Sequence, residues 1–281
     1  MEARKTCLVT GANSGIGREA ARGLLAEGFV VIMLCRNPDK AFEAQADVCK
    51  TTGSPLDRAP IVLCDLQRQD DIRRAAQEIL QRFPRLDALI NNAGLMNTDR
   101  LETPDGHEAT FAVNHLAPFL LTHLLRPRLE GSSPSRIITV SSGMHWRGKV
   151  DFDDLESKRG YSQFGVYANT KLMNVLFTRE LSRRLVGTGV TANAMHPGLV
   201  HTNFGPQKGL LKALQPLARP FMITATQGAD TAVWLASNPA VAAVSGEYFA
   251  KRKIAPSSPR SKDLDLARRL WDASAHLTGI A

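Results

Sequence analysis

Short apolar runs alternate with longer amphipathic stretches along most of the chain, and this alternation restricts the fold more than any other feature. The runs are continuously apolar, which is typical of strands buried on both faces. They lie at residues 7–10, 29–34, 61–64, 88–90, 137–140 and 190–195. Helical patterns separate them at residues 18–27, 39–51, 70–83, 107–129 and 163–185. Strand and helix in repeated succession predict a parallel, doubly wound sheet with helices on both faces.

The rest of the chain extends the same domain. A Pro- and Gly-rich stretch follows Pro197, and after it come a helix at 226–237, a strand near 246–250 and a helix at 263–278. No internal repeat and no long linker interrupts the sequence. We therefore expect residues 1–281 to form one Rossmann-type α/β domain, whose parallel sheet has about seven strands.

Composition argues against several classes of protein. The net charge is +8, but no basic run is interleaved with aromatic residues, so a nucleic-acid partner is not expected. The four cysteines form no C-x-x-C pair, and neither a disulfide framework nor a metal site at His145, His196 or His201 is expected. No apolar stretch reaches the roughly 18–20 residues that cross a bilayer. The first strand begins close to Met1, so we expect a cytoplasmic protein without an integral membrane segment.

The first strand leads into a glycine-rich turn, and residues 7–17 read CLVTGANSGIG. Glycines let the backbone turn tightly and approach a pyrophosphate, while the N-terminus of the next helix supplies N–H groups and positive potential. A lone glycine cluster is weak evidence, but this one lies at the first strand–helix junction, as dinucleotide binding requires. The residues of this turn that we expect at the cofactor are Gly11, Asn13, Ser14, Gly15, Ile16 and Gly17.

The end of the second strand favours NADP(H) over NAD(H). An NAD site usually has an acidic residue there for the ribose 2′-hydroxyl, whereas this chain has Arg36. A guanidinium suits a 2′-phosphate, and Arg18 and Lys40 are further cations in this region; the alternative for Arg36 is a solvated loop charge. Asp65 ends the third strand, where its carboxylate could accept a hydrogen bond from adenine, and Leu66 follows it at the same edge.

Tyr167 and Lys171 lie four residues apart, so they share one face of a predicted helix. A free tyrosine has a pKa of about 10, and a neighbouring ammonium group would lower it. The phenol could then exchange a proton with a substrate oxygen. This pair of residues is common by chance, so its weight depends on the residues that accompany it.

Polar residues follow two other predicted strands. Ser141 and Ser142 come directly after the strand at 137–140, at the sheet edge where ligands bind. Asn114 lies in an apolar helix, where its polar atoms need partners; the alternative there is a structural asparagine that bonds neighbouring backbone, which would not exclude a catalytic role. The residues expected to line a cofactor groove after the fourth strand are Asn92, Ala93 and Gly94.

Together these residues resemble the short-chain dehydrogenase/reductase family over nearly the whole chain. The T-G-x-x-x-G-x-G pattern stands at residues 10–17 and the N-N-A-G motif at residues 91–94. The strings CRN, VNHLAPFLLTHLL and YANTKLMNVLFTREL are most similar to the retinol dehydrogenase-like subgroup. The resemblance implies the catalytic residues Asn114, Ser142, Tyr167 and Lys171, with Ser142 preferred to Ser141. It implies further cofactor contacts from Tyr167, Lys171, Pro197, Gly198, Val200 and Thr202.

The resemblance also implies the reaction: an NADP(H)-dependent oxidoreductase would interconvert an alcohol and a carbonyl by hydride transfer, with Tyr167 as general acid/base. Ser142 would hold the substrate oxygen, and Lys171 would lower the pKa of Tyr167 and bind ribose hydroxyls. Asn114 would hold a water that links Lys171 to solvent. A non-catalytic NADP(H)-sensing protein on the same fold is the alternative.

The expected substrate is a hydrophobic aldehyde or ketone, retinal-like or another apolar carbonyl, with a steroid or other ketone as the alternative. Loops inserted near 143–165 and 199–225 are expected to cover it. Aromatic residues that could line the pocket, with ordinary packing as the alternative, are Trp146, Phe152, Phe164, Phe204 and Phe221. The helices at 107–129 and 163–185 resemble those through which family members pair, so a homodimer or homotetramer is expected.

Overall fold

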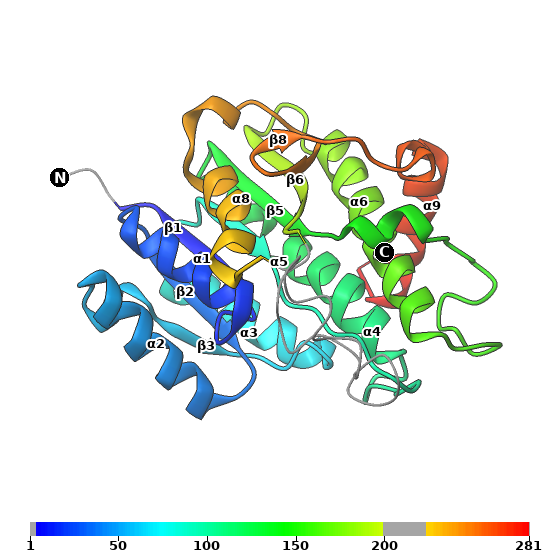
Figure 1. Cartoon of the computed structure of the whole chain (residues 1–281), viewed down its shortest axis with the longest axis horizontal. Coiled ribbons are helices and arrows are strands. Elements are labelled where there is room, and N and C mark those ends of the chain that lie inside the picture. The colour runs from blue at the N-terminus through cyan, green and yellow to red at the C-terminus, as the bar shows by residue number, and fades with distance from the viewer. Residues whose placement is uncertain (1–3, 199–222, 281) are drawn as a thin grey trace.

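The computed structural model describes residues 4–198 and 223–280. In this part of the chain eight strands form one sheet in the order β3-β2-β1-β4-β5-β6-β7-β8 (Figure 1). All neighbouring strands are parallel except β7 and β8. The strands are β1 (Thr6–Thr10), β2 (Val30–Cys35), β3 (Ile61–Leu63), β4 (Ala88–Asn91), β5 (Ser135–Val140), β6 (Val190–His196), β7 (Tyr248–Ala250) and β8 (Lys253–Ile254). The predicted doubly wound sheet is confirmed; β8, only two residues long, is too short to leave a sequence pattern.

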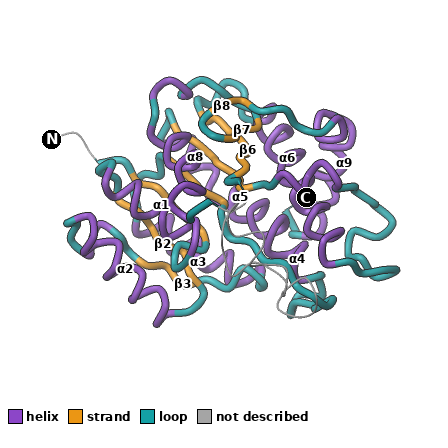
Figure 2. Tube along the Cα trace, viewed as in Figure 1, coloured by secondary structure: helices purple, strands orange, loops and turns teal. Residues whose placement is uncertain are grey.

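Helices cover both faces of the sheet (Figure 2). One face carries α1 (Gly15–Ala26), α2 (Pro38–Thr52) and α8 (Ala225–Ser237), and the other carries α3 (Gln69–Arg82), α5 (Ala117–Gly131) and α6 (Gln163–Arg184). Side chains of a strand point to alternate faces, so Cys7 and Val9 pack under the first layer and Leu8 under the second. Two covered faces explain why the strands are continuously apolar.

The helix predicted at 107–129 is interrupted. The short α4 (Ala109–Phe111) runs into a π-helical segment, Ala112–Leu116, before α5 begins. Pro118 has no N–H group for the carbonyl one turn earlier, and a π-helical turn is one way to accommodate that loss. Such segments are frequent at functional sites, and this one contains Asn114.

Residues 143–165 follow β5 and include one short 3₁₀ helix, Gly143–Arg147, before α6 begins. Phe152 packs into a cluster between α6 and the C-terminal helix α9 (Leu264–Leu277), whereas the side chains of Trp146 and Phe164 are exposed. Phe152 therefore follows the packing alternative. Phe204 and Phe221 lie outside the described residues.

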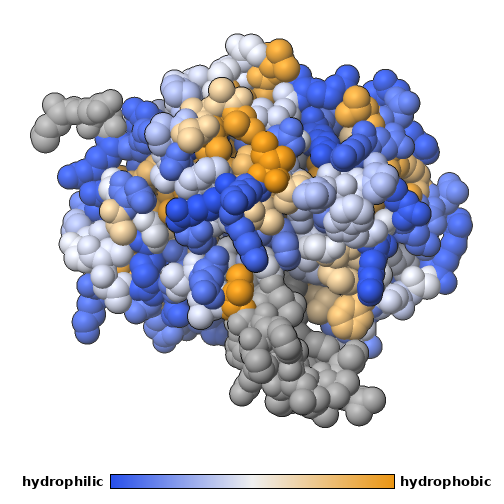
Figure 3. All heavy atoms as spheres, turned by 45° about the horizontal axis from the view of Figure 1, so that its top comes forward, coloured by the Kyte–Doolittle hydropathy of each residue, from blue (hydrophilic) through white to orange (hydrophobic). Residues whose placement is uncertain are grey.

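The surface and the buried thiols are ordinary for a globular protein. Hydrophilic residues dominate the face in Figure 3, where apolar ones form separate areas. The four cysteines are buried, and none of them forms a disulfide bond. Among the described residues, no helix is long and apolar enough to span a membrane, and no three metal-ligating side chains gather.

Candidate active site

A groove of about 320 Å³ runs along the carboxyl ends of β1, β2, β3 and β4. In doubly wound sheets ligands bind at this edge, beside the point where the strand order reverses, which here lies between β1 and β4. Predicted cofactor residues that line it are Gly11, Asn13, Ser14, Gly15, Ile16, Gly17, Arg36, Asp65, Leu66, Asn92, Ala93 and Gly94. Lining residues that the sequence motifs did not indicate are Leu34, Cys35, Cys64, Gln67, Leu95 and Val113.

The glycine-rich turn brings α1 against the end of β1. A Cβ atom at Gly17 would overlap the carbonyl oxygen of Gly11 and lie 2.5 Å from Nδ2 of Asn92, so only glycine fits there. Gly11 has φ of +66°, which glycine adopts without strain. The side chain of Ser14 at the N-cap makes no capping hydrogen bond, and the first turn of α1 has no acidic residue. The N-terminus of α1 thus borders the groove with positive potential, which suits a pyrophosphate.

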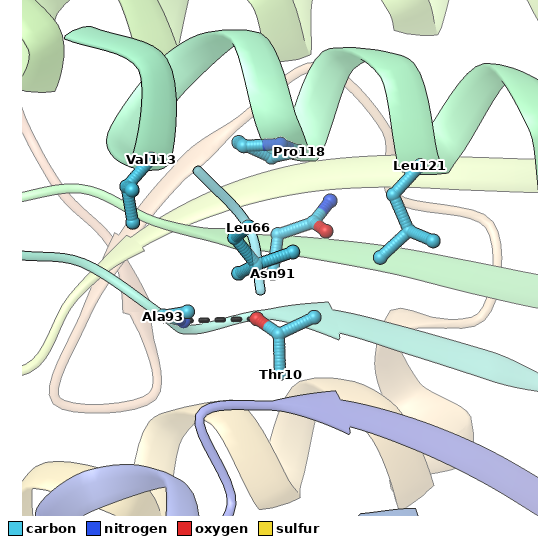
Figure 4. Close-up of a pocket in the computed structure, with 7 residues that line it drawn as sticks. All are labelled: Thr10, Leu66, Asn91, Ala93, Val113, Pro118 and Leu121. Carbon is cyan, nitrogen blue, oxygen red and sulfur yellow. Dashed lines mark hydrogen bonds between the residues drawn. The ribbon is translucent and has the colours of Figure 1, made fainter. Parts of the chain in front are cut away.

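Thr10 connects the end of β1 to the loop after β4, and Figure 4 shows its hydrogen bond with Ala93. Its hydroxyl oxygen accepts hydrogen bonds from the backbone N–H groups of Asn92 and Ala93, at 3.0 and 2.9 Å. The side-chain amide of Asn92 returns a hydrogen bond of 2.8 Å to the carbonyl of Thr10. Sequence reasoning placed Thr10 in the glycine motif but gave it no role; the structure shows that it positions the loop after β4.

Arg36 and Asp65 line the groove, whereas the two other cations predicted near Arg36 do not. Arg36 is exposed directly after β2 and lines the groove. The carboxylate of Asp65 also lines it and accepts a hydrogen bond from its own loop, at Gln67 N, of 3.1 Å. Arg18 instead lies 3.7 Å from Asp47, and neither Arg18 nor Lys40 lines the groove.

The two serines after β5 have different surroundings. Ser141 is buried, and its hydroxyl donates a hydrogen bond of 2.7 Å to the backbone carbonyl of Lys171. Ser142 is only partly buried, and its hydroxyl makes a side-chain hydrogen bond with Tyr167. The structure therefore brings Ser142, the serine chosen from the resemblance, to the tyrosine, while Ser141 anchors α6.

Tyr167 and Lys171 share a face of α6, and the Lys171 Nζ atom lies 5.3 Å from the centre of the Tyr167 ring. Burial raises the pKa of Tyr167 to about 12, although the hydrogen bond with Ser142 acts to lower it. Burial also lowers the pKa of Lys171 to about 8. In the protein without a ligand, the pKa of Tyr167 is thus shifted opposite to the expected direction, because desolvation is the larger effect.

Asn114 connects the loop after β4 with α6. Its Oδ1 accepts a hydrogen bond of 2.7 Å from Leu95 N, and its Nδ2 donates to Leu95 O at 2.9 Å and to Thr170 Oγ1 at 3.1 Å. A Cβ atom at Gly94 would lie 3.2 Å from Asn114 Oδ1 and 3.6 Å from Lys171 Nζ, so both side chains lie close to a glycine that lines the groove. The structural alternative for Asn114 holds, and its water-binding role stays a prediction.

Known proteins with the same pattern identify the family. A model of the short chain dehydrogenase family matches residues 5–210. This chain belongs to the short-chain dehydrogenase family. Retinol dehydrogenase 14 from Mus musculus is 43% identical to it over 288 residues, which cover 98% of this chain and 86% of that protein.

Solved structures agree with the assignment. An uncharacterized protein from Mycobacterium paratuberculosis matches with a TM-score of 0.81 and 34% identity, covering 99% of this chain and 94% of that one. A blue fluorescent protein from a metagenomic library, solved in complex with NADPH, matches with a TM-score of 0.68 and 27% identity, covering 88% and 96% of the two chains. This short-chain dehydrogenase is therefore an oxidoreductase with a nicotinamide cofactor and a small-molecule substrate.

The remaining predicted cofactor contacts of this short-chain dehydrogenase follow β6. Pro197 and Gly198 lie at the same sheet edge as the groove, and Gly198 has φ of +99°. Val200 and Thr202 lie outside the described residues. His196, at the end of β6, accepts a hydrogen bond of 3.2 Å from Gly143 N through its Nδ1. Sequence reasoning weighed His196 only as a metal ligand, because nothing local indicates a contact with a residue 53 positions earlier.

Proposed function

We propose that this short-chain dehydrogenase interconverts an alcohol and a carbonyl with NADP(H), and that Tyr167 transfers the proton. The observation that carries the proposal is the hydrogen-bonded Ser142–Tyr167 pair beside Lys171, next to the groove through Gly94. Glycine at position 17 supports the proposal as well, because a side chain there would collide with Gly11 and prevent the close packing of α1 on β1 that a dinucleotide-binding turn requires.

The bound cofactor supplies or accepts the hydride. In carbonyl reduction, the Ser142 hydroxyl donates a hydrogen bond to the substrate oxygen, and the Tyr167 hydroxyl delivers the proton to the alkoxide that forms. A pKa near 12 keeps Tyr167 protonated at neutral pH, which is the state that reduction requires. The Lys171 amine next to the ring stabilises the phenolate that remains whenever it carries its proton.

Replacement of Tyr167 by Phe tests the assignment of the proton. The variant removes only the hydroxyl group, so kcat should fall by about 10²–10⁴-fold, which is what general acid/base groups typically contribute. NADPH binding, followed by nucleotide fluorescence, should change little. Turnover close to that of the unaltered protein would refute the role of Tyr167.

The cofactor preference rests on Arg36. A guanidinium at the end of β2 would pair with the 2′-phosphate, and charged hydrogen bonds of this kind contribute about 1.5–3 kcal/mol, or roughly 10- to 100-fold in affinity. Arg36→Ala should therefore raise the Kd of NADPH by about that factor and leave NADH almost unaffected. Lys40→Ala is the matched control, since Lys40 does not line the groove. Equal losses for NADPH and NADH in Arg36→Ala would contradict the preference.

We propose an apolar aldehyde or ketone as the substrate, supported by the relative named retinol dehydrogenase 14. Consumption of NADPH with retinal, aliphatic and aromatic aldehydes, quinones and steroids would rank the candidates by kcat/KM. Apolar aldehydes should give the highest values. Steroids in first place would favour the alternative ketone class, and tight NADPH binding without turnover of any carbonyl would favour a sensing role.

A further inference from the structure

His145 is a fully buried histidine three residues after Ser142, and the proposed chemistry does not use it. Its Nδ1 lies 2.8 Å from the Ser142 carbonyl oxygen, and its Nε2 lies 3.1 Å from the backbone nitrogen of Ser258. The carbonyl can only accept and the backbone N–H can only donate, so the proton must be on Nδ1 and Nε2 must be the acceptor. The contacts select one neutral tautomer of the ring.

The groups packed around this ring support the neutral form. The ring lies 4.7 Å from that of Tyr248 on β7 and 5.8 Å from Trp146 in its own segment. Two groups whose charges would oppose protonation face it, Arg179 of α6 and His196 of β6. Burial, with Arg179 adding to it, lowers the pKa of His145 despite the hydrogen bond with Ser142.

The peptide group between Ser142 and Gly143 is held from both sides by histidines. His145 Nδ1 donates to its carbonyl oxygen, and His196 Nδ1 accepts from its N–H group at 3.2 Å. This peptide sets the direction of the Ser142 side chain, which must meet both Tyr167 and the substrate oxygen. A rotation of the peptide would therefore displace the serine hydroxyl.

Ser258, which donates to His145, lies in a buried and hydrogen-bonded segment. The 3₁₀ helix Pro259–Lys262 begins directly after it, and its neighbour Ser257 accepts a hydrogen bond of 2.9 Å from Arg179 of α6. Ser257, Ser258 and Ser261 are all buried. The contact between Ser258 and His145 thus joins the active-site strand β5 to the C-terminal segment, 113 residues apart in sequence.

We propose that His145 is a positioning residue, which holds the Ser142–Gly143 peptide against the C-terminal segment and so orients the Ser142 hydroxyl. The proposal rests on the proposed function of Ser142. Protonation of Nε2 would place two donors against each other at Ser258 N, and the ring would have to leave its position. Activity should therefore fall at acidic pH as His145 gains its proton.

The test compares two substitutions of the ring. His145→Phe keeps an aromatic ring at this position but makes neither hydrogen bond. It should lower kcat by about 10- to 100-fold, as small displacements of catalytic groups do. KM and NADPH affinity should change much less than kcat. His145→Asn keeps a donor near the Ser142 carbonyl and should recover most of the lost rate. Equal activity of His145→Phe and the unaltered protein, both folded, would overturn the proposal.

The pH profile gives a readout that a loss of packing would not move. The fall of kcat at acidic pH that protonation of His145 causes should be absent in His145→Asn, because the amide does not titrate. It should persist in His196→Asn, which removes the other histidine at this peptide. An acidic limb that disappears only with His196 would overturn the proposal.

The backbone donor at Ser258 offers an independent test if His145→Phe does not fold. Ser258 has φ of −59°, which proline can adopt, so Ser258→Pro removes the N–H group while Ser258→Ala keeps it. The Pro variant should lose far more kcat than the Ala variant; equal losses would count against the proposal.

Ser142→Ala distinguishes a failure of the positioning role from a failure of the proposed function. Full activity of this variant would refute the proposed function itself. An inactive Ser142→Ala beside a fully active His145→Phe would refute only the positioning role.

Discussion

At the scale of one residue, the burial of Lys171 disfavours the positive charge that the proposed mechanism requires. Its side chain is 3% exposed, and its Nζ donates a hydrogen bond of 3.1 Å to the Val140 carbonyl. Burial without a carboxylate partner lowers its pKa from 10.5 to about 8, so at neutral pH the protonated amine is held in a place that disfavours its charge. In the mechanism proposed above, this cost has a reason, because the phenolate of Tyr167 would need a nearby positive charge.

Lys171→Met should therefore stabilise the protein while abolishing turnover. The unfolding free energy at pH 7 should rise by an amount on the order of 1–3 kcal/mol, and the Val140 carbonyl keeps a hydrogen bond from Asn174 at 3.3 Å. Because the folded pKa is depressed, the stability of the unaltered protein should increase as pH rises from about 8 towards 10.5. Urea unfolding at pH 7 and pH 10 measures the effect of the substitution and the pH dependence of the unaltered protein. Lys50→Met is the control, because Lys50 is exposed. A lower unfolding free energy for Lys171→Met at pH 7 would contradict the prediction.

At the scale of elements, the 143–165 segment is fastened to the loop that precedes α4. The Glu156 carboxylate lies 2.8 Å from His107 Nδ1 and accepts a hydrogen bond of 2.6 Å from Glu108 N. Arg100 donates to the Glu156 carbonyl at 3.1 Å, and the Tyr161 hydroxyl to the Asn97 carbonyl at 2.8 Å. These contacts connect the proposed substrate loop to the loop that leads from β4.

The His107–Glu156 pair should make this attachment depend on pH. The hydrogen bond with Glu156 raises the pKa of His107 above 6.5, so its stabilisation is complete below about 6.5 and is lost as pH rises through the raised value. Burial acts to raise the pKa of Glu156, but hydrogen bonds from His107 and Glu108 N lower it overall. Its stabilisation is present above about 4.5 and is lost as pH falls through the lowered value. The pair should thus stabilise the fold most between about pH 4.5 and 6.5.

Glu156→Gln measures this contribution. Between pH 4.5 and 6.5 the variant should be less stable by about 1 kcal/mol, and the difference should shrink at pH 8. Thermal or urea unfolding at these pH values would follow it. Asp153→Asn is the control, because Asp153 is an exposed carboxylate in the same 143–165 segment. A difference that does not vary with pH would show that the charge of the pair contributes nothing.

At the scale of the whole molecule, α9 lies over helices through which pairing was expected. Trp271 packs 4.8 Å from Phe119 of α5 and 6.0 Å from Phe177 of α6, measured between ring centres. Ser274 is 2.9 Å from His115 Nε2, and Figure 1 shows α9 beside α6. The part of α5 and α6 beneath α9 is therefore occupied by this chain itself.

We predict that the protein is a monomer at micromolar concentration, because α9 takes the place of a partner on these helices. Light scattering coupled to gel filtration should give a mass near 30.7 kDa. A mass of twice that value would show that pairing uses another surface or displaces α9. The homodimer or homotetramer expected from the resemblance would then stand.

Much of the fold is readable from the sequence because it depends on local patterns. Continuous apolar runs predicted six of the strands, and a seventh was expected near 246–250; helical spacing predicted the main helices to within a few residues of their ends, apart from the one expected at 107–129. The break at Ala112–Leu116 was missed because an apolar helical pattern continues through it. The two residues of β8 were missed because they pair only with β7 and carry no pattern of their own.

The sequence by itself determined the order of strands and helices, the glycine turn and the Tyr167–Lys171 pair, since each follows from the spacing of a few neighbouring residues. Only the tertiary structure decided which serine meets Tyr167, how Asn114 is satisfied and which backbone N–H group donates to His145 Nε2. It also decided the direction of the tyrosine pKa shift. The physical reason is that burial and hydrogen-bond partners come from segments that are distant in the chain and meet only when it folds.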